Sequence, residues 1–530
     1  MFDRNQSRII IILGLLGVFT CILSFSLLSK YSAIDFKFPL EKEEIFIAAD
    51  KFIYSQGSSP LPLVRKAHVA SDQQATIYVQ KKLGVEKAGE LLESLSLYYW
   101  QVEYVFPKKK GFPFFSRDSV RLLISPLDAR IISLKHKIPL EQYEGSKALS
   151  KNEAQAIAGE FFDSIDFDIS DFKMTTYSPG ETEHLAEHIF EWEKDIADLK
   201  DAKLKVRLGI FGDKVGNFDY FLNIPDNELG VFRLNNIVNT FLFVFLNMLV
   251  FALGIFVLVV AVRRRKKIEW RFGFIFALLM AIAFLINFLK LEYRRDIYLA
   301  LFFFILVSAC AFDFIWTLIV SCVSKLFSKE VGLNFFPVKI SYSILLSYIF
   351  FFSGIGFTMF FFVFVARALN PITTLGFDSF FSEFPSNKLS CLIAPFLSLS
   401  AAVFEEVFFR ALAISFLKKY LKKTIWAILV SSLIWCFMHV SPLGYSDIYP
   451  GFVKGLILLP IGLLFGYIFV RFGLACAIAT HYLHDLVVIG AAYLEFINFR
   501  YVNLNVITML IAALLPLSIA LYFNFRKKNA

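Results

Sequence analysis

Ten apolar segments recur along the chain, and they restrict its fold more than any other feature of the sequence. One covers residues 9–28, and the others are residues 237–262, 272–289, 297–326, 340–365, 389–416, 425–438, 451–470, 474–493 and 506–523. A helix of roughly 20 apolar residues crosses the hydrocarbon core of a bilayer. Lipid also requires that every backbone polar group be bonded internally, which a helix achieves. We therefore predict a polytopic α-helical membrane protein with about ten transmembrane helices.

Basic clusters at the ends of these segments predict the topology. Arg4 and Arg8 precede the first segment, and later clusters lie at residues 263–267, 418–423 and 526–528. All of them fall on one side if each segment crosses once, and basic flanks normally remain in the cytosol. This predicts cytosolic termini and an extracytoplasmic position for residues 31–232. That region has no Asn-x-Ser/Thr sequon, which fits a bacterial cytoplasmic membrane protein.

The distribution of charge argues against a nucleic-acid partner. Residues 31–230 contain 25 Lys and Arg residues and 32 Asp and Glu residues. The rest of the chain contains 29 Lys and Arg residues and 13 Asp and Glu residues. The net charge of +9 thus comes from the flanks of the apolar segments, where basic residues set topology. We expect the lipid bilayer to be the partner of these basic flanks.

Residues 31–232 are predicted to form an α+β domain built from two similar units. Each unit begins with a helical stretch, residues 43–52 or 152–162, and continues through a segment with a central tryptophan, Trp100 or Trp192. Each ends in alternating apolar residues typical of half-buried antiparallel strands. The units resemble the small helix-and-sheet modules of the PepSY type, some of which are linked to peptidase regulation. The domain is expected to bind a regulator or the substrate.

The predicted division of the chain has four parts. Residues 1–30 form a membrane anchor, and residues 31–232 form the α+β domain. Residues 233–384 supply accessory transmembrane helices, and residues 385–530 form a catalytic core with a final helix.

Three ionisable residues lie inside an apolar segment, in the sequence Glu405-Glu406-Val407-Phe408-Phe409-Arg410. A charge near the bilayer centre costs at least a few kcal/mol, so such residues usually serve a function. Residues four apart share a helix face, which pairs Glu406 with Arg410. Glu405 is rotated by about 100° from that face and remains available as a general base. The alternative is a salt bridge that only fixes helix packing.

Two further polar sites lie in later apolar segments. His439 directly follows the segment at 425–438, and His481, His484 and Asp485 lie within the segment at 474–493. His481 and Asp485 are four apart and share a face. In the predicted topology Glu405 is near mid-membrane while His439 is toward the outer surface, so their meeting requires a short or tilted helix.

The three sites together resemble the CPBP or Abi family, the CAAX-processing and bacteriocin-immunity membrane proteases that include type II CAAX prenyl endopeptidases. The family pattern is Glu-Glu-x-x-x-Arg, an aromatic followed by x-x-x-His, and His-x-x-x-Asn/Asp. It reads here as Glu405-Glu406-x-x-x-Arg410, Trp435-x-x-x-His439 and His481-x-x-x-Asp485. Trp435 stands where Phe is common. Asp485 stands where the eukaryotic prenyl proteases have Asn, which puts direct CAAX activity in doubt.

The resemblance implies an intramembrane endopeptidase acting on a membrane-associated or lipid-modified peptide. Glu405 would activate water with help from His439, and His481 and Asp485 would stabilise the tetrahedral oxyanion. Glu406 and Arg410 would orient these groups. The same residues are compatible with two mechanisms. One is a zinc enzyme with Glu405, His439 and His481 as ligands, and the other is a metal-free glutamate mechanism. Two other functions use the same charges: a non-catalytic scaffold or immunity partner, and an ion-coupled transporter.

Overall fold

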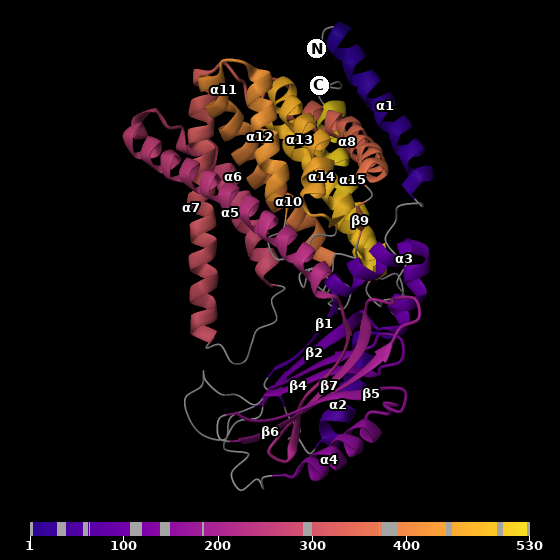
Figure 1. The fold of residues 1–530 in the computed structure, drawn as a ribbon. Coiled ribbons are helices and arrows are strands. Elements are labelled where there is room, and N and C mark those ends of the chain that lie inside the picture. Colours follow the sequence, from indigo (N-terminus) through magenta and orange to yellow (C-terminus); the bar gives the residue numbers. More distant parts are fainter. Residues whose placement is uncertain are drawn as a thin grey trace.

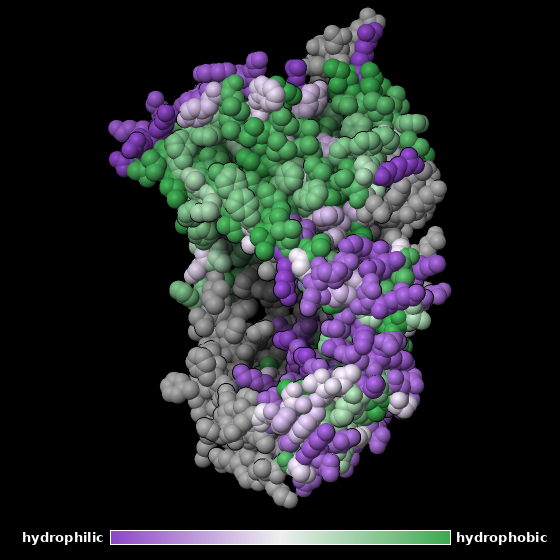
Figure 2. Space-filling view, in the orientation of Figure 1, coloured by the Kyte–Doolittle hydropathy of each residue, from purple (hydrophilic) through white to green (hydrophobic). Residues whose placement is uncertain are grey.

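A computed structural model describes most of the chain and divides it into a helical region and a sheet-containing region. The described residues are 4–28, 39–56, 62, 64–106, 119–137, 149–182, 185–289, 299–369, 371–373, 391–440, 448–494 and 502–526. Figure 1 shows the long apolar helices gathered at one end of the molecule and the sheet, with the shorter helices α2 (Lys42–Ser55) and α4 (Lys151–Ser164) beside it, at the other. Hydrophobic side chains cover the helical end, whereas hydrophilic ones dominate the visible surface of the sheet end (Figure 2).

The helical region contains a helix at each of the ten predicted segments. They are α1 (Arg4–Leu28), α5 (Asp226–Arg263), α6 (Trp270–Leu289), α7 (Leu299–Glu330), α8 (Ile340–Leu369), α10 (Ile393–Glu405) with its continuation η5 (Glu406–Ile414) and α11 (Ser415–Leu421), α12 (Thr424–Met438), α13 (Phe452–Phe472), α14 (Leu474–Leu494) and α15 (Val502–Arg526). Within the described residues, five helices are long and apolar enough to cross a membrane, and four more are shorter apolar helices. The chain is therefore a multi-pass membrane protein.

The sheet region is one eight-stranded antiparallel sheet rather than two separate units. Its strands are β1 (Val64–Ser71), β2 (Tyr98–Val105), β3 (Ser119–Ile124), β4 (Ile131–Lys137), β5 (Lys173–Thr182), β6 (Leu185–Asp195), β7 (Lys203–Phe211) and β8 (Lys214–Asn223), in the order β1-β2-β3-β4-β8-β7-β6-β5. The last strands of the two halves pair with each other, and Ser133 donates a hydrogen bond to Asp219 across this junction at 2.7 Å. Their buried apolar residues form a single core.

The two halves of the sheet region are similar but not identical. Both predicted helical stretches are helices, α2 (Lys42–Ser55) and α4 (Lys151–Ser164), and α4 begins at a capping box formed by Ser150 and Glu153. The first half has a further helix, α3 (Gln73–Ser94), between its first two strands. In the second half, β5 pairs directly with β6. Alternation of buried and half-buried residues along β2 gives the sheet its apolar face.

Helix α5 joins the two regions without a break. It begins after Pro225, directly beyond β8, and its 38 residues extend about 57 Å. Phe232 near its start belongs to the core of the sheet region, whereas Val257 and Val260 near its end belong to the core of the helical region. The two-stranded pair of β9 (Ile372–Thr373) and β10 (Ile448–Tyr449) also lies where the regions meet, because Ile372 and Tyr449 pack against the sheet core.

Candidate active site

The acidic motif lies at a change of helix type. Helix α10 ends at Glu405, and residues Glu406–Ile414 form a π-helix, η5, rather than the regular α-helix expected from the sequence. Short π-helical segments inside α-helices occur frequently at functional sites. The Ser431 hydroxyl of α12 donates a 2.5 Å hydrogen bond to the Phe409 carbonyl of this segment. A backbone carbonyl of the π-helical segment is therefore hydrogen-bonded by the neighbouring helix.

Glu406, Arg410 and His481 form a buried charged cluster. The side chains of Glu406 and Arg410 are 0% and 1% exposed, and the distance from Arg410 Nη1 to Glu406 Oε1 is 3.2 Å. The pairing predicted from the four-residue spacing is thus present. His481 Nδ1 lies 2.8 Å from the same carboxylate oxygen. The Arg410 guanidinium also lies over the rings of Trp435 and Phe465, 4.5 and 5.3 Å from their centroids.

Glu405 faces a different environment from Glu406. Its side chain is 20% exposed, and one carboxylate oxygen accepts a hydrogen bond from the indole N–H of Trp435. The same oxygen lies 3.8 Å from His481 Nε2. The two adjacent glutamates therefore differ in accessibility: Glu405 is partly exposed, and Glu406 is enclosed.

His481 connects the glutamates to Asp485. Its Nε2 atom lies 3.3 Å from Asp485 Oδ2, and the Asp485 side chain is 22% exposed. His484 Nδ1 approaches the other oxygen of Asp485 at 3.2 Å. The His481 ring also stacks on Phe465, with centroids 4.6 Å apart. Both ring nitrogens of His481 thus face carboxylates, and its position is fixed on three sides.

His439 lies one helical turn beyond Trp435, at the end of α12. Its Nδ1 atom is 2.8 Å from the Trp435 carbonyl, and the two rings are 4.7 Å apart. Among the interactions of the described residues, none joins His439 directly to Glu405 or His481. Trp435 forms the contact with Glu405 that the sequence assigned to His439. Helix α12 has only 15 residues, about 22 Å, so it is the short helix that this arrangement was expected to require.

The donor atoms do not form a metal-binding group. In the part of the chain that the structure describes, no set of three or more His, Cys, Asp or Glu side chains is arranged to hold a metal ion. The ligand set of Glu405, His439 and His481 therefore remains a prediction from the sequence.

Phe465 and the indole N–H of Trp435 are the parts of this site that the sequence did not reveal. Phe465 lies in α13 between Gly462 and Gly466, where added Cβ atoms would come within 3.0 Å of Cys436 and 2.7 Å of Ile428, residues of α12. This small-x-x-x-small pattern lets α12 and α13 approach closely. It was the one available signal that Phe465 contacts the residues at the end of α12.

Comparisons with known proteins agree with this location. Residues 387–487 match the family described as type II CAAX prenyl endopeptidase Rce1-like, and this range contains all six predicted catalytic residues. Over 93 residues the chain is 31% identical to the sporulation-killing factor biosynthesis protein SkfC of Bacillus subtilis (strain 168). That match covers 18% of this chain and 18% of the relative. No solved structure shows a significant match.

Proposed function

We propose that this chain, which carries an Rce1-like domain at residues 387–487, is an intramembrane endopeptidase that hydrolyses a peptide bond in a membrane-associated peptide or protein. The main support is the difference between the neighbouring glutamates. Glu405 is accessible and lies 3.8 Å from His481, whereas Glu406 is enclosed by Arg410 and His481. An accessible carboxylate beside a fixed imidazole is suited to general base catalysis.

The proposed reaction uses side chains with distinct tasks. Glu405 removes a proton from water as the water oxygen attacks the peptide carbonyl carbon, and it then delivers that proton to the leaving amine. The His481 imidazole stabilises the oxyanion that forms on the carbonyl oxygen. Asp485 contacts the ring at Nε2, and Glu406, which is itself paired with Arg410, contacts the ring at Nδ1. His439 acts through Trp435 rather than on the water itself.

Replacing His481 with Ala tests this function. Removing one oxyanion donor typically lowers kcat by about 10²–10³-fold. The measurement is cleavage of a membrane-inserted reporter peptide by the purified full chain in lipid vesicles. Full turnover by both His481→Ala and Glu405→Gln would contradict the proposal and favour a scaffold or an ion-coupled transporter.

The same assay distinguishes the two mechanisms that the sequence left open. A metal-free glutamate enzyme keeps its turnover after chelation and dialysis. A zinc enzyme loses turnover and regains it when zinc is added back, which would assign Glu405, His439 and His481 as candidate ligands.

Replacing Trp435 with Phe tests how Glu405 is positioned. Phe keeps an aromatic ring beside Arg410 and His439 but cannot donate a hydrogen bond to the carboxylate. A hydrogen bond to a charged group contributes about 1.5–3 kcal/mol, so we expect kcat to fall by about tenfold or more with little change in KM. Trp426→Phe, at an exposed position of the same helix, is the matched control. Unchanged kcat in Trp435→Phe would show that the indole N–H has no part in catalysis.

The proposed membrane arrangement extends the sequence predictions. Ten crossings of a bacterial cytoplasmic membrane would leave both termini in the cytosol and the sheet region outside. The sheet region, with two PepSY-like units, would bind a regulator or the substrate. A contact between the sheet region and a residue close in sequence to the candidate active site supports this role. Tyr449 of β10, ten residues after His439, packs against the core of the sheet region, including Phe232.

A further inference from the structure

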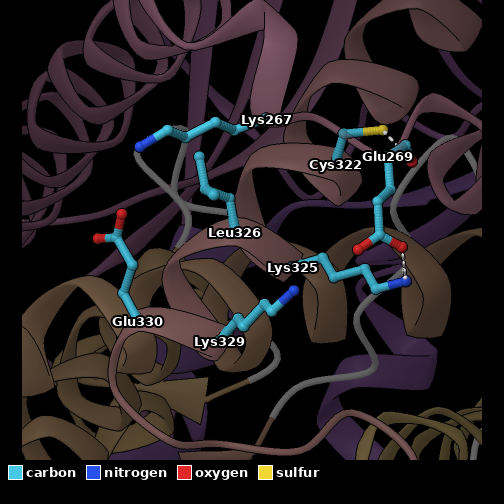
Figure 3. A pocket seen from close by; sticks show the side chains of 7 residues that line it. All are labelled: Lys267, Glu269, Cys322, Lys325, Leu326, Lys329 and Glu330. Carbon is cyan, nitrogen blue, oxygen red and sulfur yellow. Dashed lines mark hydrogen bonds and ion pairs between the residues drawn. The ribbon is translucent and has the colours of Figure 1, made fainter.

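A cavity of about 460 Å³ lies away from the candidate active site, where η2 (Arg265–Lys267), the start of α6 and the end of α7 meet. Figure 3 shows the side chains that line it, three of them lysines. The lining residues are Lys267, Glu269, Cys322, Lys325, Leu326, Lys329 and Glu330. The cavity is thus a mainly charged site at the end of apolar helices.

Both acidic side chains of the cavity are already paired. Glu269 accepts from Lys325 at 2.5 Å, and this hydrogen bond lowers the pKa of Glu269 below its usual value. Glu330 is bonded by Arg264 and, at 3.0 Å, by Lys419 of α11. Each carboxylate is therefore directly paired with a cation other than Lys267 or Lys329.

Lys267 and Lys329 are the surplus cations. Both are exposed side chains that line the cavity, and among the described residues neither has a carboxylate within 4.0 Å. Counting Arg264 and Lys419, five cations surround two carboxylates. The cavity thus carries an excess of positive charge suited to an anion.

Aromatic side chains indicate that the cavity lies at the level of lipid headgroups. Trp270 follows the cavity residue Glu269 directly and is exposed at the start of α6. Tyr420 is exposed on α11 directly after Lys419, which contacts Glu330, and Trp426 is exposed near the start of α12. Exposed Trp and Tyr gather at membrane–water interfaces, and basic sites between helices at that level bind anionic headgroups.

We propose that this cavity binds the phosphate of an anionic phospholipid headgroup, with Lys267 and Lys329 as its principal ligands. The cations supply the recognition, and the apolar outer surface of α6, with Phe274 and Leu278 exposed, accommodates the acyl chains. A soluble phosphate ester shares the headgroup's charge but has no acyl chains to contact the apolar surface of α6. This difference separates a lipid site from a site for a free phosphate.

Native mass spectrometry of the detergent-purified full chain tests the proposal. Dioleoylphosphatidylglycerol is the probe, dioleoylphosphatidylcholine is the lipid control, and glycerol 3-phosphate is the soluble headgroup. We expect phosphatidylglycerol to bind more tightly than either. The double variant Lys267→Gln/Lys329→Gln should bind it about thirtyfold more weakly, and each single variant about fivefold, from about 1 kcal/mol per lysine near a charged surface.

Lys418→Gln/Lys423→Gln is the matched control, because it removes the same charge at the same end of the helical region without touching the cavity. It should bind phosphatidylglycerol as the wild type does. Equal weakening in both double variants would show only general attraction to basic residues, and equal binding of phosphatidylcholine would show no recognition of charge. Either result would overturn the proposal. Glycerol 3-phosphate binding as tightly as the lipid would do the same, in favour of a free phosphate ligand.

Discussion

Replacing Glu405 with Gln is expected to lower kcat by about 10²–10⁴-fold, the usual contribution of a general base. The amide cannot take a proton from water, but its oxygen can still accept the hydrogen bond from the Trp435 indole. The fold and the affinity for substrate should therefore change little. Initial rates of reporter cleavage in lipid vesicles measure kcat and KM separately.

Two comparison variants sharpen this result. Glu160→Gln makes the same chemical change at an exposed position of α4 and should keep full activity. Asp485→Asn tests the other accessible carboxylate of the site, whose side chain is 22% exposed. If Asp485→Asn abolishes turnover while Glu405→Gln retains it, the general base is Asp485 and the assignment to Glu405 is wrong.

Replacing Arg410 with Met should produce the largest loss of stability. The change leaves the fully buried Glu406 carboxylate with His481 as its remaining partner. Breaking one side of a buried ion pair costs about 3–5 kcal/mol, because the other charge stays buried. The measurement is unfolding of the purified chain by a titration of sodium dodecyl sulfate in mixed micelles.

A double variant separates the cost of an unpaired charge from the cost of lost packing. Glu406→Gln/Arg410→Met removes both charges and should be more stable than Arg410→Met alone. Lys419→Met is the control: it breaks a partly exposed ion pair with Glu330 and should cost less than about 1 kcal/mol. A double variant less stable than Arg410→Met would show that Glu406 stabilises the fold through groups other than Arg410.

The local elements of the fold could be predicted from the sequence because they depend on local periodicity and composition. Long apolar segments gave the helices, and alternating residues gave strands such as β3 and β7. The junction between β4 and β8 could not be predicted. These strands are about eighty residues apart, and their register depends on the shared core rather than on a turn.

The candidate site shows the same limit. The spacing of Glu406 and Arg410 predicted their pairing, because a single helix carries both. The contact between Trp435 and Glu405 depends on the shortness of α12 and on its packing, which spacing along one helix does not report. The π-helical winding of η5 was also missed, since no residue type distinguishes it from an α-helix.

The continuity of α5 affects how this protein can be divided for study. The core of the sheet region includes Phe232, which belongs to α5, and Tyr449 and Ile372 of the helical region pack against that core. A water-soluble fragment ending near residue 225 would therefore lose these apolar contacts and expose to water side chains that are buried in the intact chain. An isolated sheet fragment would be prone to self-association, and binding measured with it would report partly on that exposed surface.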